Sequence, residues 1–465
     1  MAFEYKQASD EYLEKRTLRR HARVLHLWAL GVGAVISGDF FGWNFGLVSG
    51  GFGGMFYALI VMTIMYSGLC ASIAEMSPAL PHTGGAYSFA RAAMGPWGGY
   101  ITGLAENMEY ILTPAVIVVG IGGYLGAIFG TPKWCEPGWW LICYALFVAL
   151  NVWGVELSFR FSVGITIAAL AVLSVFWIGA IPHFDFNRWT GPWMPAGLNG
   201  VLACLPFALW FYLAIEQLPL AAEESHDPKR DMPKGLWYGL LTLIACAFLT
   251  LFLSAGIAPG AAKVGASNEP LFLGFQTIFG SGASTRLLAL VACTGLIASF
   301  HTIIFAYGRQ IYSLSRAGYF PVWLSETHGT RKTPHRALIA GAAMGYCVAL
   351  ILYLAGQESP VGAILLNMAV FGAVIAYILQ MASFIALRRK YPALERPYVS
   401  PFGILGALVA SVIASGTLIT LFFNPAYNKG VIGAAAWFIL GILYFALRGR
   451  HQLVLAPEEK FAERL

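Results

Sequence analysis

The chain has 465 residues, of which 58% are hydrophobic and only 11% are charged, and its net charge is +6. Soluble domains carry about 25% charged residues, so this composition excludes an ordinary soluble enzyme and predicts a polytopic membrane protein. The seven cysteines have no CxxC or metal-ligand spacing, so neither a disulfide framework nor a metal site is expected.

Twelve apolar runs follow one another along the chain, each long enough for a bilayer core, which needs about 20 helical residues. They lie at residues 26–50, 55–77, 97–129, 138–158, 161–181, 196–220, 235–258, 287–310, 337–356, 361–387, 401–423 and 430–447. We therefore predict an all-α protein with twelve transmembrane helices, an N-terminal arm at 1–25 and a tail at 448–465. The first run is too long for a signal peptide.

Lys and Arg are distributed unevenly between the two sides that this topology creates. With the N-terminus inside, five of the 29 basic residues lie outside, namely Lys133, Arg188, Lys263, Arg286 and Lys429. Cytoplasmic loops carry the excess of basic residues, so both termini are predicted to be cytoplasmic. The positive net charge then reflects topology and contact with anionic lipid of the bilayer, and no nucleic acid partner is expected.

Two of the runs contain residues that an uninterrupted membrane helix avoids. Residues 31–42 place Gly, Ser and Asp at mid-membrane depth, and the sixth run contains Pro206 and Glu216. Irregular backbone survives inside a bilayer only where protein or a water-filled cavity surrounds it. The breaks fall in the first and the sixth helix, which indicates an inverted-repeat transporter with its substrate between two discontinuous helices. The alternative is a glycine-rich packing face and a proline kink.

Several motifs resemble those of the amino acid–polyamine–organocation (APC) transporters. They are the first run, 74–78 (AEMSP), 81–87 (PHTGGAY), 215–216 with 222–230 (AEESHDPKR), and 312–318 (YSLSRAG). Within that superfamily, 37–46 (SGDFFGWNFG) and 103–110 (GLAENMEY) are similar to the bacterial ethanolamine permeases. The resemblance implies a five-plus-five inverted repeat (26–181 and 196–387) with discontinuous helices 1 and 6, two extra helices in 401–447, and alternating access across the bacterial inner membrane.

The resemblance places the substrate at the break in the first helix. Amino-acid members carry Gly-x-Gly there, and its bare N–H groups hold the substrate carboxylate. The corresponding positions here are Ser37, Gly38 and Asp39. An aspartate repels a carboxylate and attracts an ammonium, so this departure favours a small amine. A charged group at this depth is functional by default, although Asp39 also has the place of an N-cap for the second half-helix.

The third run adds acids on one helix face, because Glu106, Glu109 and Tyr110 are spaced by three and four residues. The first, third and sixth runs contain no Lys or Arg, so uncompensated acids favour a cationic substrate. We expect Asp39 and Glu106 to bind the ammonium and Tyr110 to line the pathway. Glu109 is a candidate for coupling or gating, with protonation or a bond to a neighbouring helix as the alternatives.

The sixth run supplies aromatic side chains. Trp210 falls where members of the superfamily place an aromatic gate or wall, and an ammonium against such a face gains about 0.5–2 kcal/mol. Tyr212 lies beside it, although aromatic residues in membrane helices often only pack. Glu216 matches the family's Glu after the break, where a hydrogen bond to unwound backbone is expected. Glu75 is interpreted as a gate or a scaffold at the cytoplasmic end of the second span.

The sequence says less about the ion to which transport is coupled. Sodium-coupled relatives use carbonyls of the first helix and hydroxyls of the eighth, where this chain has Ser299 and Thr302. Both hydroxyls also have the option of bonding to carbonyls of their own helix. The lysine that some proton-coupled relatives place in the fifth helix is absent. His301 is a candidate proton carrier, or a hydrogen-bonded packing residue.

We therefore predict a secondary transporter that imports ethanolamine, with the substrate hydroxyl on unwound backbone, Ser37 or Asn44. No cofactor is expected, and coupling to a proton or to sodium stays open. One alternative is a permease for another small cationic amine or a basic amino acid. A second is an intramembrane enzyme, disfavoured because His301 has no catalytic partner at its depth. A third is a receptor that senses the amine without moving it.

Overall fold

The structure is a computed structural model that describes residues 5–189, 193–267, 269–280, 285–355, 361–423 and 428–455. Among these residues, 10 helices are long and apolar enough to cross a membrane, and Val24–Phe40 and Pro270–Phe279 form shorter apolar helices. The chain is thus an all-helical, multi-pass membrane protein. The first four residues of the arm 1–25 and the last ten of the tail 448–465 lie outside the described residues.

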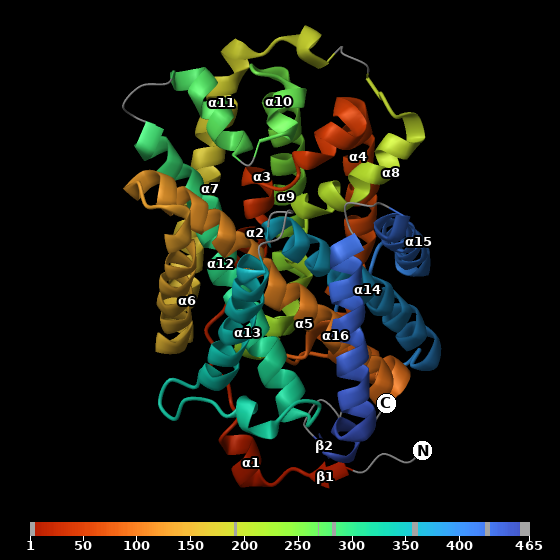
Figure 1. The fold of residues 1–465 in the computed structure, drawn as a ribbon. Coiled ribbons are helices and arrows are strands. Elements are labelled where there is room, and N and C mark those ends of the chain that lie inside the picture. The colour runs from red at the N-terminus through yellow and green to blue at the C-terminus, as the bar shows by residue number, and fades with distance from the viewer. Residues whose placement is uncertain are drawn as a thin grey trace.

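Most of the chain is divided between long helices and short connecting turns (Figure 1). The first half contains α1 (Asp10–Glu14), α2 (Val24–Val35), α3 (Ser37–Phe40), α4 (Phe45–Ala79), α5 (Gly85–Phe129), η1 (Lys133–Cys135), α6 (Glu136–Trp153), α7 (Val155–Ala180), η2 (Ile181–His183) and η3 (Phe186–Trp189). The second half contains α8 (Gly197–Ala208), η4 (Leu209–Phe211), η5 (Ile215–Glu224), α9 (Pro228–Gly256), α10 (Ala261–Gly265), α11 (Pro270–Phe279), α12 (Thr285–Arg316), η6 (Val322–Ser325), α13 (His335–Leu354), α14 (Val361–Lys390), α15 (Gly403–Phe423), α16 (Asn428–Leu447) and η8 (Gly449–His451).

Two of the twelve expected runs do not correspond to any of the ten spans. The run 26–50 is divided among α2, α3 and the first turn of α4, and the run 287–310 lies within α12. The long helices α4 and α5 are each bent at a glycine, Gly51 with φ 67° and Gly95 with φ 80°. Residues other than glycine rarely adopt such φ values, so these glycines allow each helix to change direction without ending.

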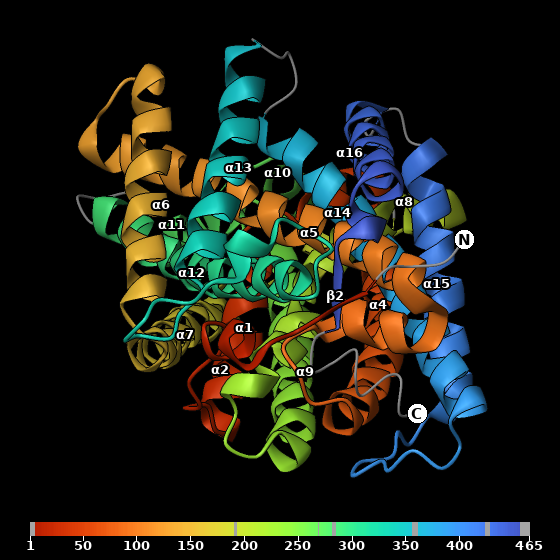
Figure 2. The same cartoon turned by 90° about the horizontal axis from the view of Figure 1, so that it is seen from below.

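The helices form a bundle around α5, which packs along α12 and α14 (Figures 1 and 2). The helix α4 packs against α8 and α9, and α2 packs against α7, α9 and α12. The outer helices α6, α15 and α16 expose large apolar side chains, for example Leu141, Leu405 and Leu440. So many exposed apolar side chains are expected on a surface that contacts lipid, in agreement with the membrane protein that the composition predicts.

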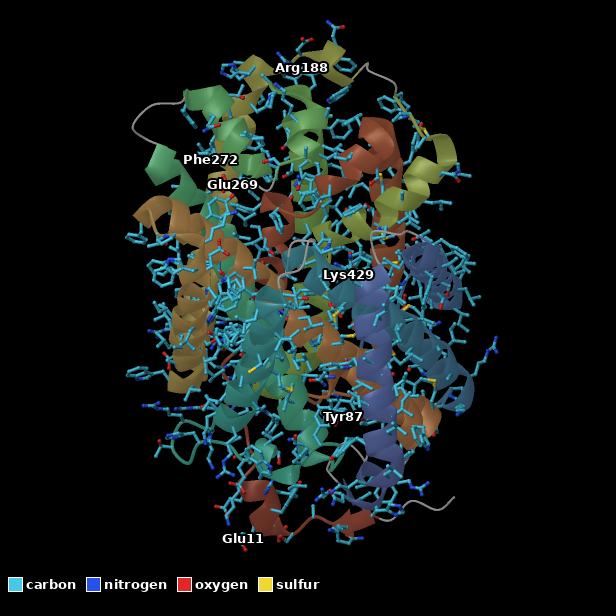
Figure 3. All side chains as sticks on the ribbon, viewed as in Figure 1. Glu11, Tyr87, Arg188, Glu269, Phe272 and Lys429 are labelled. Atoms are coloured by element: carbon cyan, nitrogen blue, oxygen red, sulfur yellow. The ribbon has the colours of Figure 1, made fainter. Side chains whose placement is uncertain are left out.

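The two ends of the bundle differ in their connecting segments. The strands β1 (Tyr5–Gln7) and β2 (Leu453–Leu455) pair in parallel at one end, near α1, and so join the two ends of the chain. The short helices α10 and α11 lie at the other end (Figure 1). Figure 3 likewise places Glu11 and Arg188 at opposite ends. Both terminal segments therefore lie on one side of the bundle, and its assignment to the cytoplasm stays a prediction.

Candidate functional site

The first break follows α3, within the expected mid-membrane segment. Phe41 is extended and Gly42 has a φ of 98°, a value that suits glycine. The side chain of Asn44 fixes the break, because its Oδ1 accepts the N–H of Gly42 at 3.2 Å. Its Nδ2 donates to the carbonyls of Val264 and Ser267 at 2.8 Å each. Asn44 therefore ties the break to α10, at the end of the bundle away from the termini.

The second break lies between α8 and η5. Helix α8 contains Pro206 and is followed by the single 3₁₀ turn η4. The backbone then leaves helical geometry at Tyr212. Ala214 has a φ of 82°, and a left-handed conformation costs a residue other than glycine about 1–2 kcal/mol. Strain of this kind persists only where the surrounding structure enforces it, and it concentrates at functional sites.

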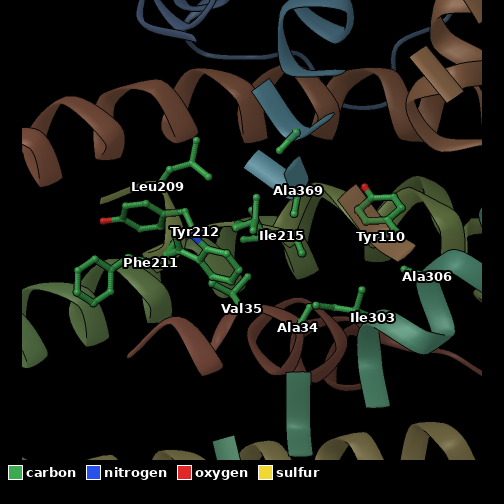
Figure 4. Packing of buried hydrophobic residues seen from close by; sticks show 14 of the residues in the cluster. Ala34, Val35, Tyr110, Leu209, Phe211, Tyr212, Ile215, Ile303, Ala306 and Ala369 are labelled. Atoms are coloured by element: carbon green, nitrogen blue, oxygen red, sulfur yellow. The ribbon is translucent and has the colours of Figure 1, made fainter. Parts of the chain in front are cut away.

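The two breaks touch each other. A Cβ built on Gly38 would lie 2.1 Å from the carbonyl oxygen of Trp210, and one built on Gly42 would lie 3.6 Å from the Trp210 ring. Figure 4 shows the residues around this contact, with Leu209, Phe211, Tyr212 and Ile215 beside Ala34 and Val35. The absence of a side chain at Gly38 is therefore what lets the two irregular segments meet.

Substitution of Gly38 by Ala is expected to destabilise the protein strongly, because the added methyl group would collide with the backbone carbonyl of Trp210 and force the backbone to shift. Thermal unfolding of the purified protein measures the effect. Gly416→Ala is the matched control, since a Cβ built at Gly416 meets nothing within 4 Å. Equal melting temperatures for the two variants would contradict the close approach at Gly38.

Hydroxyl groups from neighbouring helices hydrogen-bond to the backbone of α2 and α3, which lead into the first break. Ser299 of α12 donates to the carbonyl of Gly33 and accepts the N–H of Ser37, both at 2.9 Å. Thr166 of α7 donates to the carbonyl of Ala29 at 3.1 Å. Thr302 instead bonds to carbonyls of its own helix, as one of the two sequence alternatives proposes. Ser299 thus bridges the two sides of the bend between α2 and α3.

Asp39 is buried beside the break with an exposed fraction of 1%, and neither of its carboxylate oxygens accepts a hydrogen bond from the described residues. The hydroxyl side chain that faces it is Thr250 of α9. Asp39 lies inside α3 and caps no helix, because the N-cap residue of α4 is Asn44. A buried carboxyl group without a hydrogen-bond partner is energetically costly, so Asp39 is an exception among the buried polar side chains of this region that needs an explanation.

Glu106 has a different environment, although it is equally buried. Its Oε2 accepts a hydrogen bond of 2.6 Å from Nε2 of Gln310, and the backbone of Ala86 and Tyr87 also donates to it. These two residues form the N-terminal turn of α5, whose free N–H groups favour a carboxylate. The structure therefore supplies Glu106 with donors that Asp39 lacks.

Glu109 and Glu216 meet in the core next to Glu106. Both are buried, and neither carboxyl oxygen of Glu109 has a hydrogen-bond partner among the described residues. The hydroxyl of Tyr110 donates to Oε1 of Glu216 at 3.5 Å. The structure thus brings together three acids and the tyrosine that the sequence singled out on the third and sixth spans.

The aromatic residues of the second break point in different directions. The hydroxyl of Tyr212 pairs with Thr63 Oγ1 of α4 at 2.7 Å, and its ring lies 5.1 Å from that of Tyr66. Trp210 is buried, and its Nε1 has no hydrogen-bond partner among the described residues. Trp210 therefore keeps a free donor at the contact between the breaks, whereas Tyr212 is held against α4.

Two predicted residues lie apart from this cluster. His301 is buried against α6 and α7, where Ser158 Oγ lies 3.1 Å from its Nε2 and Asn151 Nδ2 lies 3.3 Å from its Nδ1. Glu75 forms ion pairs with Arg388 at the end of α14 and with Arg396. Among the described residues, no three His, Cys, Asp or Glu side chains form a group that could hold a metal.

Sequence reasoning missed four polar residues of this region, namely Thr250, Gln310, Tyr66 and Tyr377. The Tyr66 and Tyr377 hydroxyls lie 3.0 Å apart, and Tyr377 also contacts Glu216. Gln310 had a readable signal, because an amide within an apolar run needs a partner. The two tyrosines had none, since tyrosine is common in membrane helices for packing alone.

The chain is similar to known permeases and transporters along nearly its whole length. A family model described as "Amino acid permease" matches residues 26–454. An uncharacterized transporter of Rhizobium meliloti is 29% identical, over 91% of this chain and 90% of its own length. A branched-chain amino acid permease of Bacillus subtilis is 25% identical (94% and 95% covered), and a methylthioribose transporter of the same organism is 24% identical (95% and 96% covered).

Proposed function

The chain belongs to the amino acid permease family, and from this membership we propose that it imports a small cationic amine, with ethanolamine as the first candidate. Transport proceeds by alternating access across the bacterial inner membrane, with both termini in the cytoplasm. The ammonium binds at Asp39, and Glu106 contributes to the negative charge of the pathway.

The environment of the first break carries this proposal. Recognition of a substrate carboxylate requires free N–H groups there, but those of Ser37 and Gly42 are already bonded to Ser299 and Asn44. Those of Asp39 and Phe41 are bonded to carbonyls of Ile36 and Ser37. Both carboxyl oxygens of Asp39, by contrast, have no hydrogen-bond partner among the described residues. An acid without partners next to occupied N–H donors supports a cationic substrate without a carboxylate.

The remaining site residues have roles that follow from their positions. Trp210 forms the wall against which the ammonium lies, and its free Nε1–H is a donor for the substrate hydroxyl. Ser37 and Gly38 form the floor of the binding site. Tyr212 lines the pathway on the side of α4, and Tyr110 lines it on the side of Glu216. Asn44 borders the binding site on the side of α10, through its hydrogen bonds to that segment.

The proposed architecture has twelve helices, with inverted repeats at 26–181 and 196–387 and two further helices in 401–447. Contact between the break in the first helix and the break after α8 supports this arrangement, because an inverted repeat brings equivalent helices together at mid-membrane depth. Alternating access then requires these two segments to move against the surrounding helices.

Transport of an amino acid is the second candidate, since one similar protein is named a branched-chain amino acid permease. Another is named a methylthioribose transporter, and methylthioribose has no carboxylate, so a carboxylate is not common to the cargo of these relatives. A basic amino acid would combine both features, with its second amine at Asp39.

Binding to the full-length purified protein tests the proposal. Thermal unfolding is measured with ethanolamine, glycine, leucine, arginine, choline and putrescine, because a ligand at 100 times its Kd stabilises the native state by about 2.7 kcal/mol. We expect ethanolamine to raise the melting temperature and glycine and leucine to leave it unchanged. Uptake of labelled ethanolamine into proteoliposomes then separates transport from sensing.

Stabilisation by leucine, glycine or arginine with no effect of ethanolamine would overturn the amine proposal in favour of an amino acid. Stabilisation by ethanolamine without uptake would make the protein a receptor for the amine. Choline tests the size of the site, because its quaternary ammonium has three methyl groups and no N–H donor.

A further inference from the structure

The end of α14 carries more positive charge than its acidic partner balances. Arg388, Arg389 and Lys390 form its last turn, and Arg396 lies in the segment that leads to α15. Among the described residues, the acid paired with Arg388 and Arg396 is Glu75 of α4. Two guanidinium groups therefore share one carboxylate, and the neighbouring cations add to the surplus.

The two arginines use their nitrogens differently. Nε of Arg396 lies 3.0 Å from Oε1 of Glu75, and its other two nitrogens donate to backbone carbonyls of the surrounding turn. Arg388 contacts Glu75 through Nε and Nη2, but no described residue accepts a hydrogen bond from its Nη1. Arg388 is 23% exposed, and Arg389 is exposed without an acidic partner among the described residues. Arg396 is therefore structural, whereas Arg388 and Arg389 keep donors for an anion.

A small hollow lies beside these guanidinium groups, between α4, α14 and the segment after α14. Arg388, Arg396 and Glu75 line its polar part. The other lining residues are apolar, namely Met76, Ala79, Leu80, Phe384, Leu387 and Leu394. A hollow with apolar walls and a surplus of cations fits a molecule that combines an apolar chain with an anionic group.

The aromatic residues near the hollow indicate that it lies where the membrane meets water. Trp237 of α9 donates its Nε1–H to the hydroxyl of Tyr398 at 2.7 Å, and its ring lies 6.2 Å from that of Phe402. Trp and Tyr concentrate at the two membrane–water interfaces. Phe402 and Leu405 are 46% and 71% exposed, so an apolar surface continues from this level along α15.

The same end of the bundle carries both terminal strands. Lys390 donates to the carbonyl of Ala93 in α5 at 2.6 Å, and Arg91 of that helix donates to the hydroxyl of Tyr5 in β1. The hollow therefore opens towards the leaflet on the side of the termini.

We propose that this hollow, with Arg388 and Arg389, binds the phosphate of an anionic phospholipid. The phosphate lies at the mouth of the hollow, because the hollow itself is small, and accepts a hydrogen bond from Nη1 of Arg388. Helix α15 begins beside this nitrogen, since a Cβ built on Gly403 would lie 3.5 Å from it, and a helix N-terminus favours an anion. Basic pockets between membrane helices bind such headgroups.

The division of roles within the site follows from these contacts. Glu75 and Arg396 hold α4, α14 and the segment before α15 together, while Arg388 and Arg389 supply the charge that the lipid recognises. The acyl chains lie against the exposed apolar surface of α15 at Phe402 and Leu405. The site is separate from the two helix breaks, so this proposal does not depend on the identity of the transported substrate.

Native mass spectrometry of the full-length protein in a neutral detergent tests the site. Phosphatidylglycerol and phosphatidylcholine are titrated separately, since both contain a phosphate but only the first has a net negative charge. A basic side chain near the surface strengthens binding of an anionic lipid about fivefold, which is about 1 kcal/mol. We expect phosphatidylglycerol to bind at least about fivefold more tightly than phosphatidylcholine. Equal affinities would overturn the proposal.

Two variants locate the binding site without removing the partner of Glu75. Arg389→Gln should weaken binding of phosphatidylglycerol about fivefold and leave phosphatidylcholine unchanged. Arg388→Lys keeps a positive charge for Glu75 but lacks the second terminal nitrogen, so it should also weaken phosphatidylglycerol. Arg230→Gln is the matched control, because Arg230 is an exposed cation at the start of α9. An equal loss of affinity in Arg230→Gln and Arg389→Gln would mean attraction by general surface charge and would overturn the site.

Competition distinguishes a lipid from a free phosphate ion. Inorganic phosphate is added to the complex with phosphatidylglycerol, with sodium chloride of equal ionic strength as the control. Equal displacement by the two salts is expected, because a free ion makes no use of the apolar walls. Stronger displacement by phosphate would assign the site to a soluble anion and overturn the lipid proposal.

Discussion

Replacement of Asp39 by Asn is expected to abolish binding of a cationic amine while leaving the protein folded. The carboxyl group of Asp39 is buried, and the Thr250 hydroxyl is the side chain that faces it, so a bound ammonium would be its main partner. Loss of one member of such a buried charge pair weakens binding by about 2–5 kcal/mol. The dissociation constant measured by calorimetry should therefore rise by about 30- to 5000-fold.

The stability of the same variant separates binding from a structural role. An unpaired buried carboxylate destabilises the ligand-free protein, so Asp39→Asn should leave the melting temperature unchanged or raise it. A structural acid would behave in the opposite way, with a lower melting temperature on removal. Glu156→Gln, on the exposed face of α7, serves as the control for a neutralised acid. Affinity within threefold of the wild type would remove Asp39 from recognition.

The sequence predicted the helical architecture because bilayer length and apolar composition are local properties. Both breaks were also readable, since Asp39, Pro206 and Glu216 are residues that membrane helices avoid without a reason. The exact backbone was not readable. The left-handed Ala214 and the extended Phe41 depend on contacts with distant helices, and alanine has no local preference for such a conformation.

The difference between Asp39 and Glu106 likewise depends on tertiary structure. Both residues are acids in apolar runs, and we expected the same role for both from the sequence. Glu106 finds Gln310, which lies 204 residues away in the chain, and the N-terminal turn of α5. No local pattern reports such a partner. Asp39 keeps its free oxygens because α9 offers it only Thr250.

The ion pair between Glu224 and Arg309 was not predicted, although an arginine at the edge of an apolar helix was a visible signal. Both side chains have an exposed fraction of 0%, and the contact is bidentate, with Nη2–Oε1 at 2.8 Å and Nε–Oε2 at 3.2 Å. The backbone carbonyl of Glu224 also accepts the N–H groups of His21 and Ala22 from the N-terminal arm. This pair therefore joins η5, α12 and the arm at the end that carries both terminal strands.

Glu224→Gln is expected to destabilise the protein by about 3–5 kcal/mol, because it leaves the guanidinium of Arg309 buried without a counter-charge. Reversible unfolding or the melting temperature of the purified protein measures the loss. The matched control is Glu156→Gln, since the Glu156–Arg160 pair has exposed fractions of 53% and 71%. Exposed pairs contribute about 0–1 kcal/mol, so this variant should be nearly silent.

The double variant Glu224→Gln with Arg309→Met distinguishes an unpaired charge from lost packing. Removal of both charges eliminates the buried cation, so the double variant should be more stable than Glu224→Gln alone. A double variant at least as unstable as the single one would mean that the arm and α12 depend on packing around these side chains. The ion pair would then add no stability beyond that of apolar contact, and packing between η5, α12 and the arm would hold this end of the bundle together.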